Sequence, residues 1–353
     1  YGIWTLVLSF IGYFGLLQLG VSAGIMRYIP YYSGKKEDFH ANGIFSSAFA
    51  FYVFVGIVIF SISFFFAPVI AAFFGKGTDF IALVRLVGVA SAIHCPAAVL
   101  DASLRSKEGF VQANCLAVFL AITKAVGLVI VLKAGYGIVG MGWIMLIQSV
   151  VGYCLHWIIL KLTFPALSLS LKCIKYCYFK DLLMFGLLAA VMSLGFMLRF
   201  NSDRVIIGRV LDMEAVGIYG LAAALMLKYR SAIGAVSRVL RPRFSLLDGQ
   251  NNKELMKGLF FRSTKTVAFV AVGIGGILFA LGPAFIQLWV GSGFEQAYPV
   301  LLILVFAQII DQSQTPTISL LTGSGKQGFL AGLAIAEGLS GIFLSILLYR
   351  YGL

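Results

Sequence analysis

Residues 109–132 read GFVQANCLAVFLAITKAVGLVIVL, an almost wholly apolar run in which Lys124 is the one charged residue. At about 1.5 Å per residue, a helix of this length crosses the roughly 30 Å hydrocarbon core of a bilayer. Comparable runs recur along the chain, at about 2–26, 42–72, 79–104, 109–132, 136–160, 182–210, 215–237, 262–289, 297–321 and 328–349. The sequence therefore predicts an all-α, polytopic membrane protein with ten spans in this chain.

The composition supports the same fold class. The 353 residues are 60% hydrophobic and 12% charged, and their mean hydropathy is +0.98. Soluble domains carry charge on roughly a quarter of their residues, so a conventional soluble enzyme is excluded. The net charge of +13 would form a basic face without long apolar runs in a nucleic-acid-binding protein. We therefore expect a lipid bilayer, and no nucleic acid, as a partner.

The basic residues indicate the topology instead. Most of them fall in the connectors after the first, third, fifth, seventh and ninth spans and at their flanks: Arg27, Lys35, Lys36, Arg105, Lys107, Lys161, Lys172, Lys175, Lys180, Arg230, Arg238, Arg241, Arg243, Lys253, Lys257, Arg262, Lys265 and Lys326. Connectors rich in Lys and Arg stay in the cytoplasm. We expect these five connectors to be cytoplasmic, in the inner membrane of a prokaryote.

The cysteines and Pro68 each support one further expectation. The five cysteines do not form a disulfide framework, and Cys173 and Cys177 lack neighbouring ligands at zinc spacing, so we expect neither a metal site nor a cofactor. The run at 42–72 is too long for one straight span, and Pro68 is expected to break or tilt its outer end.

An internal repeat appears when the chain is compared with itself at an offset of about 215–220 residues. The pairs are Tyr1-Gly2-Ile3-Trp4 with Val216-Gly217-Ile218-Tyr219, Gly34 with Gly249, Phe73 to Gly77 with Trp289 to Gly293, Pro96 with Pro316, Lys107 to Phe110 with Lys326 to Phe329, and Tyr136-Gly137-Ile138 with Tyr351-Gly352-Leu353. Both copies have the same predicted orientation. The repeat therefore predicts two bundles related by a pseudo-twofold axis along the membrane normal.

The repeat also predicts the domain organisation. We expect an N-terminal bundle at 1–161, a cytoplasmic linker at 162–180 and a C-terminal bundle at 181–353. At this repeat offset, the span at 182–210 has an equivalent in the other copy only if a helix precedes Tyr1. The span at 136–160 has an equivalent only if a helix follows Leu353. The expectation is therefore ten of at least twelve spans, with one helix missing before Tyr1 and at least one missing after Leu353.

Several short motifs resemble the polysaccharide transporter family. They are Gly2-Ile3-Trp4 with Leu19-Gly20, Arg27, Tyr31, Gly34, Lys35 and Asp38; Asp203 to Gly208 with Gly217 and Tyr219; Leu288 to Gly291 with Phe294, Ala297 and Tyr298; and Leu321-Thr322-Gly323 with Gly325-Lys326. That family belongs to the superfamily of the multidrug and toxic-compound exporters (MATE) and the lipid II flippases. The resemblance covers essentially the whole chain, except that the family's usual first helix is absent.

The resemblance implies a MATE-like fold and a function. The protein would be a flippase that moves polyprenyl-diphosphate-linked oligosaccharide repeat units across the cytoplasmic membrane by alternating access, for O-antigen, capsule or exopolysaccharide biosynthesis. It would not be an enzyme. Its expected partners are the lipid-linked glycan, a polysaccharide polymerase and other assembly proteins.

Charged residues at membrane depth are the candidate site residues. A charge near the bilayer centre costs about 2.5–3.5 kcal/mol on insertion scales, so it normally faces a bundle interior or a water-filled cavity. Lys124 and Lys228 lie two turns or more from either end of their predicted helices, whereas Arg85 and Arg199 lie nearer the outer ends and could snorkel. We expect all four cations to line the cleft between the bundles and to attract the diphosphate of the carrier.

Acidic residues in the spans suggest ion coupling. Asp101 lies four residues before Arg105, and Asp203 lies four after Arg199, so each can pair along its own helix. Asp311 and Glu337 have no such neighbour, and Asp311 lies in a polar cluster just before Pro316, at an expected kink. We predict that Asp311 and Glu337 bind the coupling ion.

Two other functions remain as alternatives. A cation-coupled multidrug exporter of the same superfamily would favour an acidic, aromatic cavity. A membrane glycan polymerase or ligase would be expected to have a large extracytoplasmic loop with catalytic residues, whereas the connectors predicted outside are about ten residues or fewer, and no nucleophile and base stand out. The cations Arg85 and Lys124 in the first bundle favour an anionic substrate.

Overall fold

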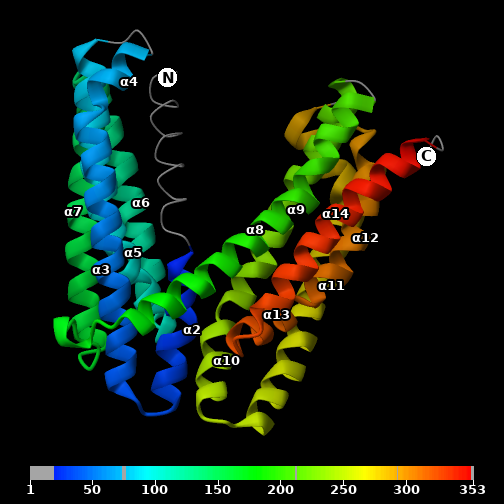
Figure 1. The fold of residues 1–353 in the computed structure, drawn as a ribbon. Coiled ribbons are helices and arrows are strands. Elements are labelled where there is room, and N and C mark those ends of the chain that lie inside the picture. The colour runs from blue at the N-terminus through cyan, green and yellow to red at the C-terminus, as the bar shows by residue number, and fades with distance from the viewer. Residues whose placement is uncertain (1–19, 74–76, 211–212, 292, 351–353) are drawn as a thin grey trace. The chain divides into compact units, whose positions relative to one another are not determined.

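The long apolar runs of the sequence form long α-helices (Figure 1). The computed structural model describes residues 20–73, 77–210, 213–291 and 293–350, with side chains at these positions except 73, 171, 198–210, 213–216, 236, 345, 346 and 348–350. Across these ranges the chain is helical with short turns, and no strand occurs in them. Eight of the described helices are long and apolar enough to cross a membrane. The predicted all-α, multi-pass fold class is confirmed.

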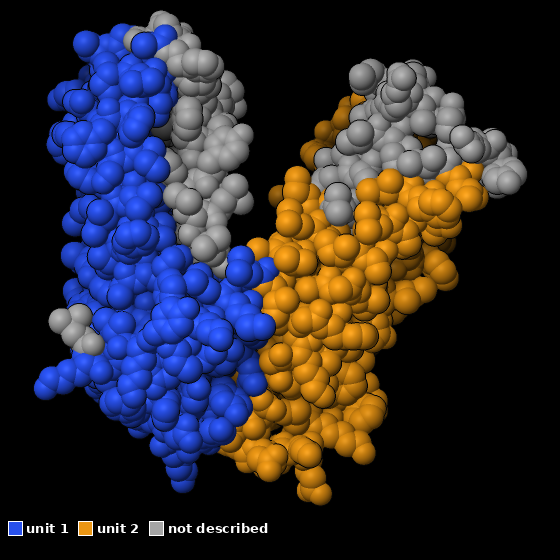
Figure 2. Space-filling model, in the orientation of Figure 1, with its two compact units in different colours: residues 1–187 blue, residues 188–353 orange. Residues whose placement is uncertain are grey.

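The chain divides into two compact units, unit 1 at Tyr1–Leu187 and unit 2 at Leu188–Leu353, which are coloured separately in Figure 2. The division falls inside one long helix, α8. The described elements of unit 1 are α2 (Val21–Gly34), α3 (Asp38–Phe65), α4 (Ala67–Phe73), α5 (Thr78–Ser106), α6 (Phe110–Lys133), α7 (Gly137–Thr163), the short 3-10 turn η1 (Leu171–Cys173) and the start of α8 (Tyr176–Val210).

Unit 2 contains the rest of α8 and a second set of helices. These are α9 (Met213–Arg238), α10 (Leu240–Gly249), α11 (Lys253–Val290), α12 (Ala297–Ser313), α13 (Thr315–Gly323) and α14 (Gln327–Arg350). Residues 238–262, predicted as a connector, instead contain α10 and the first turns of α11. The span predicted at 2–26 lies mostly outside the described residues, and α9 is not among the eight candidate spans.

The prolines end some helices and not others. Pro68 is the second residue of α4, where no intrahelical N–H is needed, so the predicted break after α3 is confirmed. Pro316 is likewise the second residue of α13, and the chain breaks between α12 and α13 at Gln314. Its repeat partner Pro96 lies inside α5, which continues without a break from Thr78 to Ser106.

The internal repeat recurs in the turns of the two units. α2 ends at Gly34 and α10 at Gly249, and each is followed two residues later by a left-handed residue, Lys36 (φ 61°) or Asn251 (φ 53°). The next N–H returns to a carbonyl five residues back in both, Glu37 to Tyr32 and Asn252 to Leu247. The turn after α5, with Glu108 at φ 66°, and that after α13, with Gly325 at φ 76°, close in the same way.

The segment predicted as a linker packs inside unit 1. The Asn42 side chain on α3 donates to the carbonyl oxygen of Ala166 at 3.3 Å and accepts from the N–H of Ser168 at 2.9 Å. One turn further along α3, Ser46 accepts from the N–H of Ser170 at 3.0 Å. Leu167 and Cys173 are buried, and α8 begins at Tyr176 rather than near residue 182. The first half of the predicted linker is therefore held against the start of α3 by hydrogen bonds.

Candidate functional site

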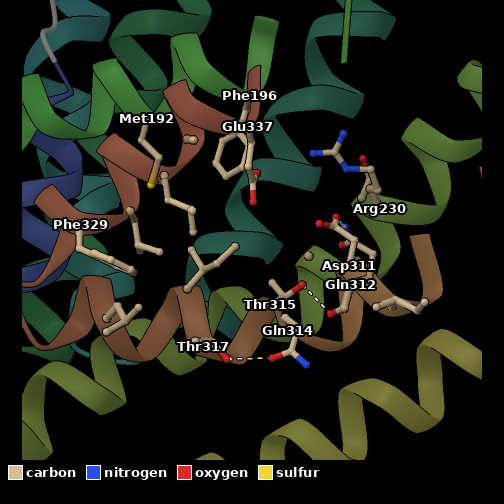
Figure 3. Close-up of a pocket in the computed structure, with 18 of the residues that line it drawn as sticks. Met192, Phe196, Arg230, Asp311, Gln312, Gln314, Thr315, Thr317, Phe329 and Glu337 are labelled. Atoms are coloured by element: carbon tan, nitrogen blue, oxygen red, sulfur yellow. Dashed lines mark hydrogen bonds between the residues drawn. The ribbon is translucent and has the colours of Figure 1, made fainter. Parts of the chain in front are cut away.

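A cavity of about 620 Å³ lies within unit 2, among α8, α9, α12, α13 and α14 (Figure 3). Part of its lining is apolar and includes Met192, Phe196, Phe329, Leu330 and Leu333. The polar and charged side chains of the lining are Arg230, Ser231, Asp311, Gln312, Gln314, Thr315, Thr317 and Glu337. A cavity that combines apolar walls with a few convergent polar groups is typical of a ligand site.

Helical spacing explains which side chains reach this cavity. On α9, Leu227, Arg230, Ser231 and Gly234 follow one another at intervals of one to three residues and share one face. On α14, Phe329, Leu330, Leu333, Ala334 and Glu337 form a similar stripe. Charged residues on these stripes face the interior of unit 2.

The break between α12 and α13 supplies the polar wall. Pro316 has no N–H to donate to the carbonyl oxygen of Gln312, four residues earlier. The hydroxyl of Thr315 donates to that oxygen instead, at 2.7 Å. The chain therefore turns at Gln314 without leaving the carbonyl unsatisfied, and Gln312, Gln314 and Thr315 all line the cavity.

The charged groups of the cavity come from three helices. Asp311 Oδ2 accepts a hydrogen bond from Gln312 Nε2 at 2.8 Å. Figure 3 shows Glu337 of α14 and Arg230 of α9 directed into the same cavity as Asp311 of α12. The described lining therefore places two carboxyl side chains and one guanidinium around a single cavity.

The structure brings together two of the six predicted site residues. Asp311 and Glu337, which are 26 positions apart, both line the unit 2 cavity. Lys228 is exposed, whereas Arg230, two residues further along α9, lines the cavity. The side chain of Arg199 lies outside the described residues.

Lys124 is half-buried on α6 of unit 1, and hydrogen bonds elsewhere on this helix join it to α5 and α7. Its neighbour Thr123 accepts a hydrogen bond from Gln148 of α7 at 2.9 Å. The predicted pair of Asp101 and Arg105 is confirmed at 2.8 Å, and Arg105 also donates to Asn114 of α6 at 2.9 Å. His156 of α7 approaches the same carboxylate at 3.6 Å.

Arg85 is held at the end of a helix. Its Nε donates to the carbonyl oxygen of Phe64 at 3.3 Å, and its guanidinium lies 4.7 Å from the centre of the Phe64 ring. Phe64 is in the last turn of α3, where carbonyls have no intrahelical donor. Arg85 therefore satisfies the end of α3, a structural role that does not require a substrate.

Two residues were not predicted from the sequence, Arg230 of the unit 2 cavity and His156 beside Asp101 in unit 1. Arg230 was assigned to the basic connector because it lies close to Arg238, Arg241 and Arg243, but it faces the cavity. His156 was not singled out, although it lies at membrane depth on a predicted span. A signal for Arg230 was available, since the Leu227, Arg230 and Gly234 positions share one helix face.

The sequence matches the family described as "Polysaccharide biosynthesis protein" over residues 1–299. It is also 28% identical over 201 residues to the teichuronic acid biosynthesis protein TuaB of Bacillus subtilis (strain 168), a match that covers 55% of this chain and 40% of that protein.

Solved structures of MATE transporters resemble the fold. A multidrug resistance MATE family transporter of the MOP superfamily, in an outward-facing conformation, matches with a TM-score of 0.73 at 17% identity, covering 99% of this chain and 84% of that one. MATE in complex with MaD3S gives a TM-score of 0.76 at 14% identity, with coverages of 99% and 87%. A MOP superfamily transporter from Pyrococcus furiosus gives a TM-score of 0.65 at 16% identity, with coverages of 99% and 87%.

Proposed function

Because the chain belongs to the polysaccharide biosynthesis protein family and has a MATE-like, multi-pass membrane fold, we propose that it is a flippase for polyprenyl-diphosphate-linked oligosaccharides. It would move the sugar head group across the cytoplasmic membrane of a prokaryote by alternating access. The observation that carries this proposal is family membership over residues 1–299 together with a charged cavity inside a helical unit of a transporter fold. A polysaccharide polymerase and other assembly proteins would act beside it.

The distribution of basic residues sets the proposed orientation. Eighteen of the 27 Lys and Arg residues lie in or next to the turns after α2, α5 and α13, the segment after α7, and the region from residue 230 to residue 265 that contains α10, and segments rich in Lys and Arg remain in the cytoplasm. We call the end of each unit that carries these turns the basic end. In this proposal the basic ends face the cytoplasm, where the lipid-linked glycan is assembled.

Asp311 and Glu337 are the proposed coupling site. The two carboxylates line one cavity together with Arg230. A proton or a sodium ion bound by a carboxylate would change the charge of the cavity, and the gain or loss of the ion would change its electrostatic energy. Gln312, which donates to Asp311, would orient the carboxylate.

Lys124, Lys228, Arg85 and Arg199 are proposed to attract the diphosphate of the carrier. Lys124 has the strongest support, because it is half-buried at membrane depth next to Thr123, which accepts a hydrogen bond from Gln148. Arg85 has the weakest, because its guanidinium already satisfies the end of α3. A lysine in a low-dielectric cavity binds phosphate as a compact point charge.

Complementation of a flippase-deficient strain tests the assignment. The full-length protein carrying Lys124→Gln and Lys228→Gln together should restore little surface polysaccharide at equal protein level. Lys253→Gln, which removes an exposed cation at the start of α11, serves as the matched control and should restore it fully. Normal polysaccharide from the double variant would show that these two cations are not needed.

A cation-coupled multidrug exporter is the second candidate, and one observation favours it. The unit 2 cavity combines Asp311 and Glu337 with the aromatic rings of Phe196 and Phe329, which suits an organic cation. Cells that express the full-length protein would then resist lipophilic cationic dyes, and Asp311→Asn would abolish the resistance. Restored polysaccharide without such resistance would favour the flippase.

A further inference from the structure

A second cavity, entirely apolar, lies on unit 1. It is a groove of about 480 Å³ whose floor is α5 and whose two walls are α3 and α7. The floor carries Val89, Ala92, Ile93 and Pro96, and the walls carry Val53, Gly56, Ile57, Phe60, Val150 and Tyr153. All ten positions are described, and the hydroxyl of Tyr153 is the one polar side-chain group among them. We call this feature the α3–α7 groove.

Close packing of α3 on α5 shapes the base of this groove. Pro96 cannot donate to the carbonyl oxygen of Ala92, so that oxygen loses its helical partner. The backbone of α3 covers it at Gly56, where a Cβ would lie only 2.7 Å from the Ala92 oxygen. The small residues Gly56 and Ala92 therefore let α3 and α5 pack closely at the base of the groove, and the carbonyl oxygen freed by Pro96 is covered by a Cα–H contact.

The groove lies at the depth of hydrocarbon. Val89 to Pro96 are 11–18 residues from the outer end of α5, or about 17–27 Å along a helix about 43 Å long. Ile57 is 58% exposed and Phe60 is 38% exposed, so the walls are open rather than sealed. In a bilayer such a channel is filled by a hydrocarbon chain, because an empty channel forfeits the dispersion contacts of its lining.

A cation and aromatic rings lie beyond the groove, toward the basic end of α7. On α7, Val150, Tyr153, Trp157 and Lys161 share one face at intervals of three and four residues. The Trp157 ring lies 6.2 Å from the ring of Phe49 on α3, and Lys161 Nζ lies 5.6 Å from the Trp157 ring. Trp and Lys at this level are typical of the zone of lipid head groups, where a cation attracts an anionic head group.

We propose that the α3–α7 groove binds the isoprenoid chain of the polyprenyl-diphosphate carrier, with Lys161 near the anionic head group. This inference rests on the proposed flippase function. A single apolar channel whose α7 wall continues to Lys161 complements a lipid that has one chain and an anionic head, whereas a phospholipid has two chains to accommodate. The chain would remain in the groove at the surface of unit 1 while the glycan crosses elsewhere.

Photolabelling of the purified full-length protein in lipid nanodiscs tests the proposal. One probe is a polyprenyl diphosphate with a diazirine in its isoprenoid chain, and the other is phosphatidylglycerol with a diazirine in an acyl chain. The polyprenyl probe should label peptides that contain Val53–Phe60 and Val89–Pro96, and excess unlabelled polyprenyl diphosphate should reduce this labelling at least fivefold. Excess phosphatidylglycerol should not reduce it.

Two variants fill the groove and one control leaves it open. Ala92→Phe on the floor, and Ile57→Trp on the wall as a second variant in case the first fails to fold, should each reduce the labelling at least fivefold. Ala117→Phe adds the same bulk at an exposed position of α6 outside the groove and should leave labelling unchanged. Lys161→Gln should raise the concentration of polyprenyl diphosphate needed for competition.

The outcomes distinguish a failure of the groove proposal from a failure of the flippase proposal. Labelling that phosphatidylglycerol displaces and polyprenyl diphosphate does not would overturn the proposal and identify an ordinary phospholipid site. Labelling by the polyprenyl probe that persists in both groove-filling variants would overturn it as well. Glycan flipping without groove labelling refutes only the groove, whereas competed groove labelling in a protein that does not flip glycan refutes only the flippase.

Discussion

Proline at residue 96 and glycine at residue 56 act as a pair in unit 1. The first frees the carbonyl oxygen of Ala92, and the second lets the backbone of α3 cover that oxygen. In unit 2 the corresponding proline, Pro316, frees the carbonyl of Gln312, which Thr315 satisfies with its hydroxyl. In both units a proline thus removes the N–H that would bond to a helix carbonyl oxygen. In unit 1 the backbone of α3 covers that oxygen and α5 continues, whereas in unit 2 the Thr315 hydroxyl bonds to it and the helix breaks.

Gly56→Ala should destabilise the protein. The added Cβ would meet the Ala92 oxygen at 2.7 Å, and neither backbone can move without separating α3 from α5. We expect a loss of about 1–3 kcal/mol in the free energy of unfolding, as for other overpacked positions. Gly276→Ala on α11 is the control, because nothing lies within 4 Å of its Cβ. Thermal unfolding of the full-length protein in detergent that gives equal midpoints for both variants would contradict the close contact.

Lys107 predicts a pH dependence of stability. It lies at the turn after α5, and its Nζ donates to Ser33 Oγ at 2.5 Å. Burial lowers the pKa of Lys107, while the charge of Asp38 opposes that change. Between the lowered pKa and the ordinary value of 10.5, the unfolded chain holds more protons at this site than the folded one. The free energy of unfolding should therefore rise with pH across that window.

Lys107→Met should remove this alkaline rise, because no titrating group is then left at the site. The measurement is the unfolding midpoint from pH 8 to pH 10.5 in detergent. Lys326→Met changes an exposed lysine at the equivalent turn of unit 2 and should keep the rise. An unchanged rise in Lys107→Met would assign the dependence to another group.

The break between α12 and α13 is the element that forms the polar wall of the unit 2 cavity. We expect Thr315→Val to leave the Gln312 carbonyl unsatisfied and to cost about 1–3 kcal/mol. Pro316→Ala restores an N–H for that oxygen, so the double variant should recover most of the loss. A double-mutant cycle on unfolding midpoints measures this coupling. Strictly additive effects would mean that Thr315 does not replace the missing N–H.

The turns of the two repeats offer a second test at the level of elements. Lys36, Glu108 and Asn251 are non-glycine residues with positive φ. A left-handed conformation costs roughly 1–2 kcal/mol for an ordinary residue, whereas asparagine tolerates it better. Lys36→Gly and Glu108→Gly should therefore raise the free energy of unfolding by up to about 1 kcal/mol, and Asn251→Gly by less. Equal or negative changes in all three would contradict these backbone conformations.

The spans could be predicted from the sequence because their length and apolar composition are set by the bilayer. α10 could not, since its basic residues match those of an exposed connector while Phe244 and Leu247 are buried. Asp311 and Glu337 could be chosen as candidates because they lie deep within predicted spans. Which charged side chains share a cavity depends instead on how each helix is rotated about its axis. Lys228 and Arg230 lie on different faces of α9, and only the face shared by Leu227, Arg230 and Gly234 lines the cavity, so a choice by depth alone selected Lys228 and missed Arg230.

At the scale of the whole molecule, the repeat and the family membership point to transport. Equivalent turns recur in both units at an offset of about 215 residues, although the charged cavity of unit 2 and the apolar groove of unit 1 differ in chemistry. The pseudo-twofold relation between the bundles remains a prediction. In the proposed function, unit 2 responds to the coupling ion and unit 1 holds the carrier chain.

The most direct test is flipping by the full-length protein in proteoliposomes that contain a polyprenyl-diphosphate-linked oligosaccharide. We expect the glycan to become accessible to an external glycan-cleaving enzyme faster in proteoliposomes with the protein than in protein-free liposomes. A proton or sodium gradient should accelerate this exposure, and the double variant Asp311→Asn, Glu337→Gln should remove the acceleration. Asp79→Asn, an exposed carboxylate at the start of α5, should keep it. Glycan exposure no faster than in protein-free liposomes, under any gradient, would contradict the flippase assignment.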